Sequence, residues 1–415
     1  MTKNVFRNTL YTHDNLYILS GIDSELVDLI YLDPPFNSKR MYSAPVGSKA
    51  AGASFKDMWT WKDVNEYYLD TLADQFSVLA KYIASVGVVH GKPMMAYLTY
   101  MAQRIVEMHR VLKDTGSLYL HCDSTASHYL KIMLDFVFGK NNFRNEILWC
   151  YTGPGSPGMR QFNRKSNTIF WYSKSKTWTF NKDAVRMPYK DKNQTFRKIF
   201  DTKGGWTEED VEELRGKGKI PENWWTDIAI VARSKRERTG YPTQKPLKLL
   251  KRIILASSNE GDIVMDPFCG CATTCVAAEQ LGRKWMGIDI EKQPVKILID
   301  RLSDASGRLF KDFTATDQIP QRSDLTVVLP SPSVKEQLYK EQKGKCNACG
   351  DDFKIWNLEI DHIIPKNKGG GDYYENYQLL CANCNRIKGD RPMEYLRLKI
   401  ETRERTMKNK IFFGE

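Results

Sequence analysis

The segment Asp33-Pro34-Pro35-Phe36 has side chains that can turn an amino group on a base into a nucleophile. Such a group is a poor nucleophile because its lone pair is delocalised into the ring. The Asp33 carboxylate and a backbone carbonyl held by the prolines can accept hydrogen bonds from both N–H groups, which localises the lone pair on nitrogen. The Phe36 ring can stack on the base once the base has left the duplex. The alternative interpretation is a proline-rich strand end without chemistry.

A second segment, residues 266–274, has the small side chains of a ligand-binding turn. It follows a predicted strand and opens a predicted helix, so backbone amides can approach a ligand closely and the helix N-terminus favours polar groups. Asp289 follows Asp266 by 23 residues at the end of the next predicted strand, where an acid can bind two ribose hydroxyls. Taken alone, such a turn is more often an ordinary strand–helix connection. Together with residues 33–36, it predicts the second half of a methyl-transfer site.

A third group of residues has the spacing of a zinc site. Cys346 and Cys349 form one C-x-x-C unit, Cys381 and Cys384 form another, and 31 residues separate the two units. Four thiolates close a tetrahedral zinc site, whereas four unrelated buried cysteines would rarely show this spacing. The nine cysteines of the chain are an odd number. Number and spacing together argue for metal ligands and reduced thiols rather than a disulfide framework.

The net charge of +12 is concentrated in one part of the chain. Residues 160–252 contain 23 Lys and Arg against 11 Asp and Glu, so their surplus equals the net charge of the whole chain. A local basic excess indicates a polyanionic partner, most simply the phosphate backbone of DNA, although a solvated basic surface would look the same. Aromatic residues interleaved with these charges are expected to stack on bases: Phe162, Phe170, Trp171, Tyr172, Trp178, Phe180, Trp206, Trp224 and Trp225.

The order of the apolar segments predicts an α/β fold, and a chain of 415 residues is long enough for at least two domains. Predicted strands alternate with predicted helices, which is typical of a parallel sheet with helices on its faces. Residues 151–240 look irregular, and the proline-containing residues 315–333 are the expected linker. The predicted strands are 26–32, 117–121, 146–151, 261–266 and 285–289, and the predicted helices are 96–112, 125–138, 246–256 and 273–282.

Over roughly residues 1–310 these motifs resemble the amino-methylating DNA methyltransferases of the β arrangement. In that family the catalytic D-P-P-[FY] precedes the cofactor loop because the Rossmann-like sheet is circularly permuted, and a target-recognition segment lies between them, here at about 150–240. The resemblance implies the cofactor S-adenosylmethionine, and Ala272 stands where the family often has glycine. It assigns cofactor binding to Asp14, Thr243, Gln244, Lys245, Asp266, Phe268, Gly270 and Asp289, and catalysis to Asp33, Pro34, Pro35 and Phe36. Within the recognition segment, the candidates for phosphate contacts or for sequence readout are Arg160, Arg164, Arg233, Arg236 and Arg238, and the sequence does not decide between these two roles.

Residues 338–392 closely resemble the HNH nucleases, which have a zinc-stapled ββα-metal fold. The resemblance makes His362 the general base that activates water and Asp361 a ligand of a divalent cation, expected to be Mg²⁺. Asn376 would orient the loop. Asn385 occupies the signature position that is usually His, and an Asn carbonyl is also a ligand for a hard cation. A zinc-folded DNA-binding module without cleavage is the alternative.

We therefore expect a DNA methyltransferase domain at 1–314 fused to an HNH endonuclease domain at 334–415, a restriction-modification arrangement acting on double-stranded DNA. Adenine N6 is the favoured target because Asp opens the catalytic motif, and cytosine N4 is the alternative. The intact Asp33, Pro34 and Phe36 argue against a methyltransferase-like part that only senses sequence or methylation. The chain has no apolar run of membrane-helix or signal-peptide length, so we expect no membrane partner and a cytoplasmic location. The sequence leaves the oligomeric state open, including a homodimer, as well as the recognition sequence.

Overall fold

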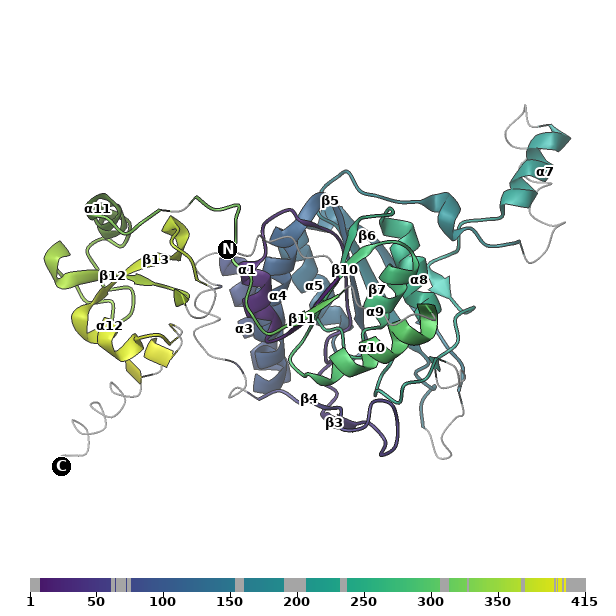
Figure 1. The fold of residues 1–415 in the computed structure, drawn as a ribbon, viewed down its shortest axis with the longest axis horizontal. Helices are drawn as coiled ribbons and strands as arrows, with labels where there is room; N and C mark the ends of the chain where they lie inside the picture. The colour runs from purple at the N-terminus through teal and green to yellow at the C-terminus, as the bar shows by residue number, and fades with distance from the viewer. Residues whose placement is uncertain are drawn as a thin grey trace.

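The computed structural model describes residues 8–60, 64, 72, 76–153, 160–189, 207–231, 237–306, 313–326, 328–366, 370–391, 393, 395–397 and 399–400. In Figure 1 these residues form a large α/β unit and a small C-terminal unit at the left of the view. Within the described ranges, no helix has both the length and the apolar character needed to cross a membrane.

Nine strands of the described chain form one sheet in the large unit. They are β1 (Thr9–Thr12), β2 (Val27–Leu32), β5 (Leu112–Cys122), β6 (Phe143–Cys150), β7 (Ser166–Ser173), β8 (Trp224–Trp225), β9 (Ile263–Asp266), β10 (Lys284–Asp289) and β11 (Thr314–Thr316). Their order is β11-β1-β10-β9-β2-β5-β7-β6-β8. Neighbours are parallel, except that β7 runs antiparallel to both β5 and β6. The sheet is therefore mostly parallel, as the sequence predicts.

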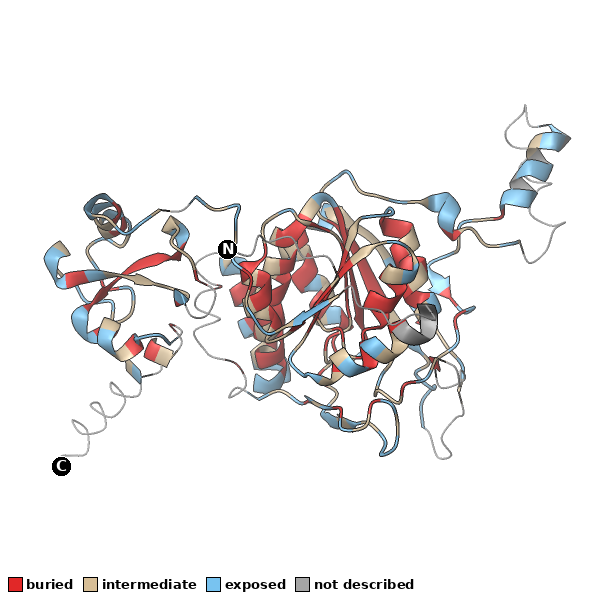
Figure 2. Cartoon of the chain, viewed as in Figure 1, coloured by how far each residue is buried: buried red, intermediate tan, exposed pale blue. Residues whose placement is uncertain are grey.

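Helices cover both faces of this sheet, and each face has its own apolar core, seen as red segments in Figure 2. Strand β2 contributes to both cores because successive side chains point to opposite faces. Its Ile30 and Leu32 enter one core, and Leu29 and Tyr31 enter the other. The first face carries α1 (Asn15–Gly21), α3 (Ser77–His90), α4 (Lys92–Val111) and α5 (Ser127–Phe138), and the second carries α8 (Leu247–Ser257), α9 (Thr273–Gln280) and α10 (Gln293–Ser306).

The expectation that 151–240 is irregular is wrong for residues 166–173, because these form β7 inside the sheet. Helices cover the sheet on both sides there, so the apolar residues of β7 are buried. Phe170, Trp171 and Tyr172 consequently belong to the core, as does Trp225 of β8, and they cannot stack on bases as predicted. Phe162 and Trp224 are exposed, whereas Trp206 lies outside the described residues.

Four further features of the described large unit lie outside its sheet. A hairpin of β3 (Arg40–Ser43) and β4 (Ser54–Asp57) follows the Asp-Pro-Pro-Phe segment. Two single-turn 3₁₀ helices, η2 (Lys140–Asn142) and η3 (Lys182–Val185), connect larger elements. Helix α7 (Glu208–Lys217) extends away from the sheet at the upper right of Figure 1.

The small unit is an antiparallel pair of strands with α-helices packed around a core of its own. Its elements are α11 (Pro332–Glu341), η5 (Ile355–Asn357), β12 (Leu358–His362), η7 (Tyr374–Asn376), β13 (Tyr377–Cys381) and α12 (Ala382–Lys388). The predicted linker begins inside the large sheet, because β11 pairs with β1. Further along it, Ser323 donates hydrogen bonds to Asp23, so this stretch is fastened to the large unit.

Candidate functional site

The two turns predicted to carry chemistry lie at the same edge of the large sheet. Asp33 follows β2, Asp266 ends β9 and Asp289 ends β10, and these strands are neighbours. Parallel strands have their carboxyl ends at one edge, so the three acids converge. They line a cavity of about 860 Å³, within the range of roughly 300–1,000 Å³ that is usual for small-molecule sites. The cavity is lined by every predicted methyl-transfer residue, namely Asp14, Asp33, Pro34, Pro35, Phe36, Thr243, Gln244, Lys245, Asp266, Phe268, Gly270 and Asp289.

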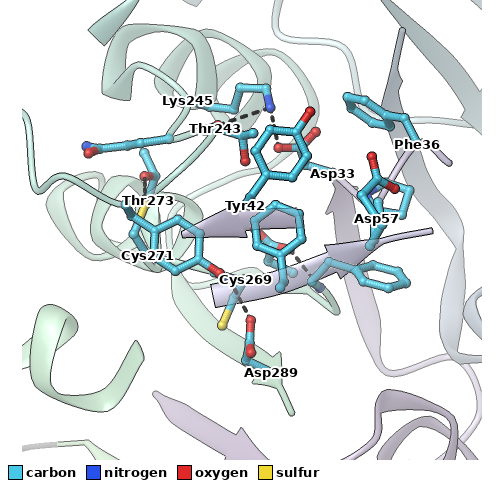
Figure 3. A pocket seen from close by; sticks show the side chains of 18 of the residues that line it. Asp33, Phe36, Tyr42, Asp57, Thr243, Lys245, Cys269, Cys271, Thr273 and Asp289 are labelled. Atoms are coloured by element: carbon cyan, nitrogen blue, oxygen red, sulfur yellow. Dashed lines mark hydrogen bonds and ion pairs between the residues drawn. The ribbon is translucent and has the colours of Figure 1, made fainter. Parts of the chain in front are cut away.

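The Asp33 side chain offers this cavity an acceptor that has no donor (Figure 3). Its Oδ2 is paired with the ammonium group of Lys245, whereas its buried Oδ1 has no hydrogen-bond partner among the described residues. A buried polar atom without a partner is uncommon because it costs free energy, and a bound N–H group would satisfy it. Burial raises the pKa of Asp33 above its ordinary value, and the positive charge of Lys245 opposes this rise.

Phe36 packs against a buried histidine whose role we did not predict from the sequence. The rings of Phe36 and His121 are stacked, with centroids 6.3 Å apart and an interplanar angle of 15°. His121 Nδ1 lies 2.9 Å from the hydroxyl of Tyr31, and its Nε2 lies 2.8 Å from the amide nitrogen of Asn167. Burial lowers the pKa of His121 well below its ordinary value. The ring is therefore neutral at pH 7, able to donate at one nitrogen and accept at the other. Its position at the end of the strand predicted at 117–121 was the available signal.

Asp57 is a second residue that the sequence reasoning missed, and it fixes the turn after Phe36. It ends β4, is 2% exposed, and accepts the backbone N–H groups of Asn37 at 2.7 Å and Ser38 at 3.0 Å. Asn37 and Lys39 both have φ of 61°, in the left-handed region that non-glycine residues rarely adopt. Two charge-assisted hydrogen bonds thus hold an unfavourable turn directly beside the catalytic segment.

The loop after β9 is held from within by the two acids at the strand ends. Asp266 accepts hydrogen bonds from the backbone N–H of Phe268 and the hydroxyl of Thr274, and Asp289 accepts the N–H of Gly270 at 2.9 Å. Gly270 has φ of +50°, and a Cβ there would lie 3.0 Å from the Tyr241 ring. Burial raises the pKa of Asp266 to about 7 and that of Asp289 to about 6. Every residue of this loop from Asp266 to Cys271 lines the cavity.

A further wall of the cavity is aromatic and is braced by a buried arginine. Asp14 caps α1 by accepting the N–H of Leu16, and it forms an ion pair with Arg104 at 2.8 Å. The Arg104 guanidinium lies 3.3 Å from the centre of the Tyr100 ring. Tyr100 in turn contacts Trp59, with ring centroids 4.2 Å apart. The aromatic rings suit a purine, Asp289 suits the hydroxyls of a ribose, and the buried Lys245 suits a carboxylate. The cavity therefore fits S-adenosylmethionine.

The four predicted zinc ligands come together in the small unit. The Sγ atoms of Cys346, Cys349, Cys381 and Cys384 all lie within 4.8 Å of one another. Thiolates about 2.3 Å from a tetrahedral zinc ion would be roughly 4 Å apart, so the cluster fits zinc. Cys346 and Cys349 lie between α11 and η5, whereas Cys381 ends β13 and Cys384 lies in α12, so one ion would join both halves of the unit.

The predicted nuclease residues lie at the end of β12 and on the facing elements. His362 Nε2 is 2.9 Å from the Asp372 carboxylate, which leaves Nδ1 as the second ring nitrogen. The amide of Asn376 accepts the N–H of Ile364 and donates to the carbonyl of the same residue, so it holds the loop after His362. This geometry is the one that a loop-orienting residue needs.

Asp361 lies on β12 and Asn385 on α12, and each is bonded to a residue that the sequence did not single out. The ammonium of Lys388, 1% exposed, lies 3.0 Å from Asp361, and Asn385 donates to Glu359 at 2.6 Å. The carboxylate and amide oxygens of Asp361, Asn385 and Glu359 are donors that suit a hard divalent cation. Such a cation would compete with Lys388 for Asp361.

The predicted DNA-contacting arginines are only partly covered by the structure. Arg160, Arg164 and Arg238 are exposed, as a phosphate contact requires. Arg233 and Arg236 lie outside the described residues.

Comparisons with known proteins match both units. The DNA methylase family matches residues 27–300, and the HNH endonuclease family matches residues 346–391. The protein named DNA adenine methyltransferase YhdJ of Escherichia coli (strain K12) is 30% identical over 328 residues, covering 78% of this chain and 93% of that protein. The type II methyltransferase M.HpaI of Haemophilus parainfluenzae is 33% identical over 227 residues, covering 54% of this chain and 63% of that protein. A solved structure of the PvuII DNA methyltransferase (cytosine-N4-specific) aligns with 76% of this chain and 97% of its own, at 16% identity and a TM-score of 0.45.

Proposed function

The chain belongs to the DNA methylase family of amino-methyltransferases and carries a C-terminal HNH endonuclease domain; on this premise, we propose that it methylates adenine N6 in double-stranded DNA. The observation that carries the proposal is the buried Oδ1 of Asp33, which has no hydrogen-bond partner in the described part of the chain and belongs to the cavity that the cofactor loop also lines. An exocyclic amino group supplies the N–H donors that this atom lacks.

The mechanism assigns each part of the cavity a separate task. When bound, S-adenosylmethionine supplies an electrophilic methyl group. Asp289 would hold its ribose, and Thr243, Gln244 and Lys245 would hold its methionine end. Asp33 and the Pro34 carbonyl would accept the two N–H groups of the base, which keeps the nitrogen lone pair available for attack. The amino nitrogen must lose one proton after methylation, and the raised pKa of Asp33 suits its Oδ1 to receive that proton.

Phe36 has the supporting role of stacking on the flipped base. Its ring packs against His121, which Tyr31 and Asn167 hold in place. A rigid aromatic surface lowers the entropic cost of fixing the base for in-line attack.

Adenine is favoured over cytosine because an acid opens the catalytic motif, and because a relative with 30% identity is named a DNA adenine methyltransferase. Cytosine N4 is the second candidate, since its amino group offers the same two N–H donors. The test is to incubate the protein with labelled S-adenosylmethionine and DNA from a methylation-free host, then hydrolyse the DNA to nucleosides. Label in N6-methyladenine supports the proposal, and label in N4-methylcytosine replaces it with the second candidate.

The small unit supports a second activity, hydrolysis of DNA by the HNH site. We propose that His362, oriented by Asp372, activates water while Asp361 and Asn385 bind a divalent cation, expected to be Mg²⁺. Supercoiled plasmid incubated with Mg²⁺ should be nicked or linearised by the wild type and left intact by His362→Ala. A zinc-dependent DNA-binding module would bind the plasmid without cutting it.

A further inference from the structure

Lys245 occupies the place in the cavity that the proposed mechanism gives to the target base. Its ammonium is paired with Oδ2 of Asp33, and the same ammonium lies 5.7 Å from the centre of the Phe36 ring (Figure 3). Asp33 and Phe36 are the two side chains that would bind the amino group and the face of the base. One cation is therefore paired with Asp33 and also lies close to the Phe36 ring.

The ion pair between Lys245 and Asp33 is buried, which strengthens the attraction between the two charges. Lys245 is 8% exposed, and an ion pair shielded from water is screened much less than one at the surface. While Lys245 holds Oδ2, the neutral amino group of an entering base would meet a positively charged donor, which repels the partial positive charge on its own N–H groups. His121 is stacked on one face of the Phe36 ring, so a base cannot stack on that face instead.

The Lys245 side chain can change its conformation although the backbone around it is held in place. Gln244, the preceding residue, accepts hydrogen bonds from the N–H and hydroxyl of Thr239 and donates to the carbonyl of Glu237. Pro246, the following residue, is the N-cap of α8. The backbone is thus fixed on both sides of Lys245, whereas its four-methylene stem can redirect the ammonium without moving the turn.

A ligand carboxylate would find few other cations in this cavity. Acids dominate the lining, with Asp14, Asp33, Asp57, Asp123, Asp266, Asp289 and Glu291. Of the lining side chains in the described part of the chain, Lys245 is the one that is both buried and a lysine or arginine. An amino-acid carboxylate entering such a site needs this ammonium as its counter-ion.

We propose that Lys245 is a latch: its ammonium, paired with Oδ2 of Asp33 and 5.7 Å from the centre of the Phe36 ring, occupies space that the target base needs, and the carboxylate of the bound cofactor draws it away. This inference rests on the proposed methyl transfer. It makes Lys245 a positioning residue that imposes an order, because the base site opens only after the cofactor is in place. An enzyme built in this way does not hold a flipped base without a methyl donor.

The latch predicts that Asp33 and the ligand carboxylate compete for one ammonium, which binding measurements can detect without any turnover. The probes are S-adenosylhomocysteine, which has the amino-acid carboxylate, and 5′-methylthioadenosine, which lacks it. Asp33→Asn should tighten S-adenosylhomocysteine about tenfold by releasing Lys245, and should leave 5′-methylthioadenosine within about twofold. Lys245→Met should weaken S-adenosylhomocysteine at least about tenfold and remove its advantage over 5′-methylthioadenosine.

The double variant and a matched control complete the experiment. In the Lys245→Met background, Asp33→Asn should no longer tighten S-adenosylhomocysteine, because the competition has been removed. Lys248→Met is the control, since Lys248 lies three residues further along the chain, in α8, and pairs with Asp227 outside the cavity. Its ratio of affinities for the two probes should equal that of the wild type. Circular dichroism and thermal unfolding would establish that each variant is folded.

Two outcomes would overturn the latch, and a third concerns the proposed function. If Asp33→Asn leaves S-adenosylhomocysteine affinity unchanged or weakens it, Asp33 does not compete for Lys245. If folded Lys245→Met keeps the wild-type ratio for the two probes, the cofactor carboxylate does not use Lys245. If the wild type binds neither probe, the methyltransferase proposal itself fails, and the latch fails with it.

Discussion

Removing the Asp57 carboxylate should cripple methyl transfer, although Asp57 is not one of the groups that contact the proposed substrate. Its two oxygens accept the N–H groups of Asn37 and Ser38, directly after the catalytic segment. Asp57→Ala leaves two donors without an acceptor in a turn where Asn37 and Lys39 have φ of 61°. The turn should then relax, and Phe36 should lose its position.

The size of the effect follows from the two bonds. A hydrogen bond to a charged group contributes about 1.5–3 kcal/mol, and two bonds to one carboxylate are not additive, so their joint loss should cost about 3 kcal/mol. That is roughly a hundredfold change in the population of the closed turn. Asp57→Asn keeps one acceptor and should cost about half as much, roughly tenfold.

The assay compares turnover at saturating DNA and cofactor for the wild type, Asp57→Asn and Asp57→Ala. We expect turnover to fall in that order, and to fall more than the affinity for the cofactor does, with faster amide exchange at residues 37–39. Asp183→Ala is a control, because Asp183 pairs with Arg186 on an exposed turn. A folded Asp57→Ala with wild-type turnover and unchanged exchange at 37–39 would refute the reasoning.

Three further predictions concern zinc, pH and the nuclease. Purified full-length protein should contain about one zinc per chain, and Cys384→Ser should lose it together with stability of the small unit; elemental analysis without zinc in the wild type contradicts the site. Because burial raises the pKa of Asp289 to about 6, its carboxyl becomes protonated below that pH and loses acceptor capacity, so cofactor affinity should fall about tenfold per pH unit below 6. Asp289→Asn should bind the cofactor weakly at pH 8, and its affinity should not depend on pH in this range. If calorimetry shows that the wild-type affinity is the same above and below pH 6, the prediction is wrong. Pre-methylated plasmid should resist Mg²⁺-dependent cutting while unmethylated plasmid is cut, and His362→Ala should abolish cutting but keep methylation; equal cutting of both plasmids would exclude protection by the methyl mark.

The parts of the site that the sequence could predict are those at strand ends. Asp33, Asp266 and Asp289 each follow or end a buried apolar run, and the geometry of a parallel sheet alone brings such positions to one edge. The zinc ligands were predictable for a similar reason, because two C-x-x-C units constrain each other.

The contacts that position these groups could not be predicted from the sequence, because they join segments that are distant in the chain and meet only in the folded structure. Lys245 pairs with Asp33 across 212 positions of the chain, and Asp57 reaches the catalytic turn only because a hairpin folds back over it. Strand β7 was missed because its apolar core of four residues sits in a basic, aromatic stretch. Its burial depends on insertion between β5 and β6 rather than on a local pattern.

The most direct test of the account is the fate of a labelled methyl group when Asp33 is changed. Wild-type protein and Asp33→Ala are each incubated with labelled S-adenosylmethionine and DNA from a methylation-free host, and the nucleosides are separated and counted. The account predicts label in N6-methyladenine for the wild type and none for Asp33→Ala, although the variant still binds S-adenosylhomocysteine. Methyl transfer by Asp33→Ala at close to the wild-type level would contradict the role given to Asp33 and the mechanism built on it.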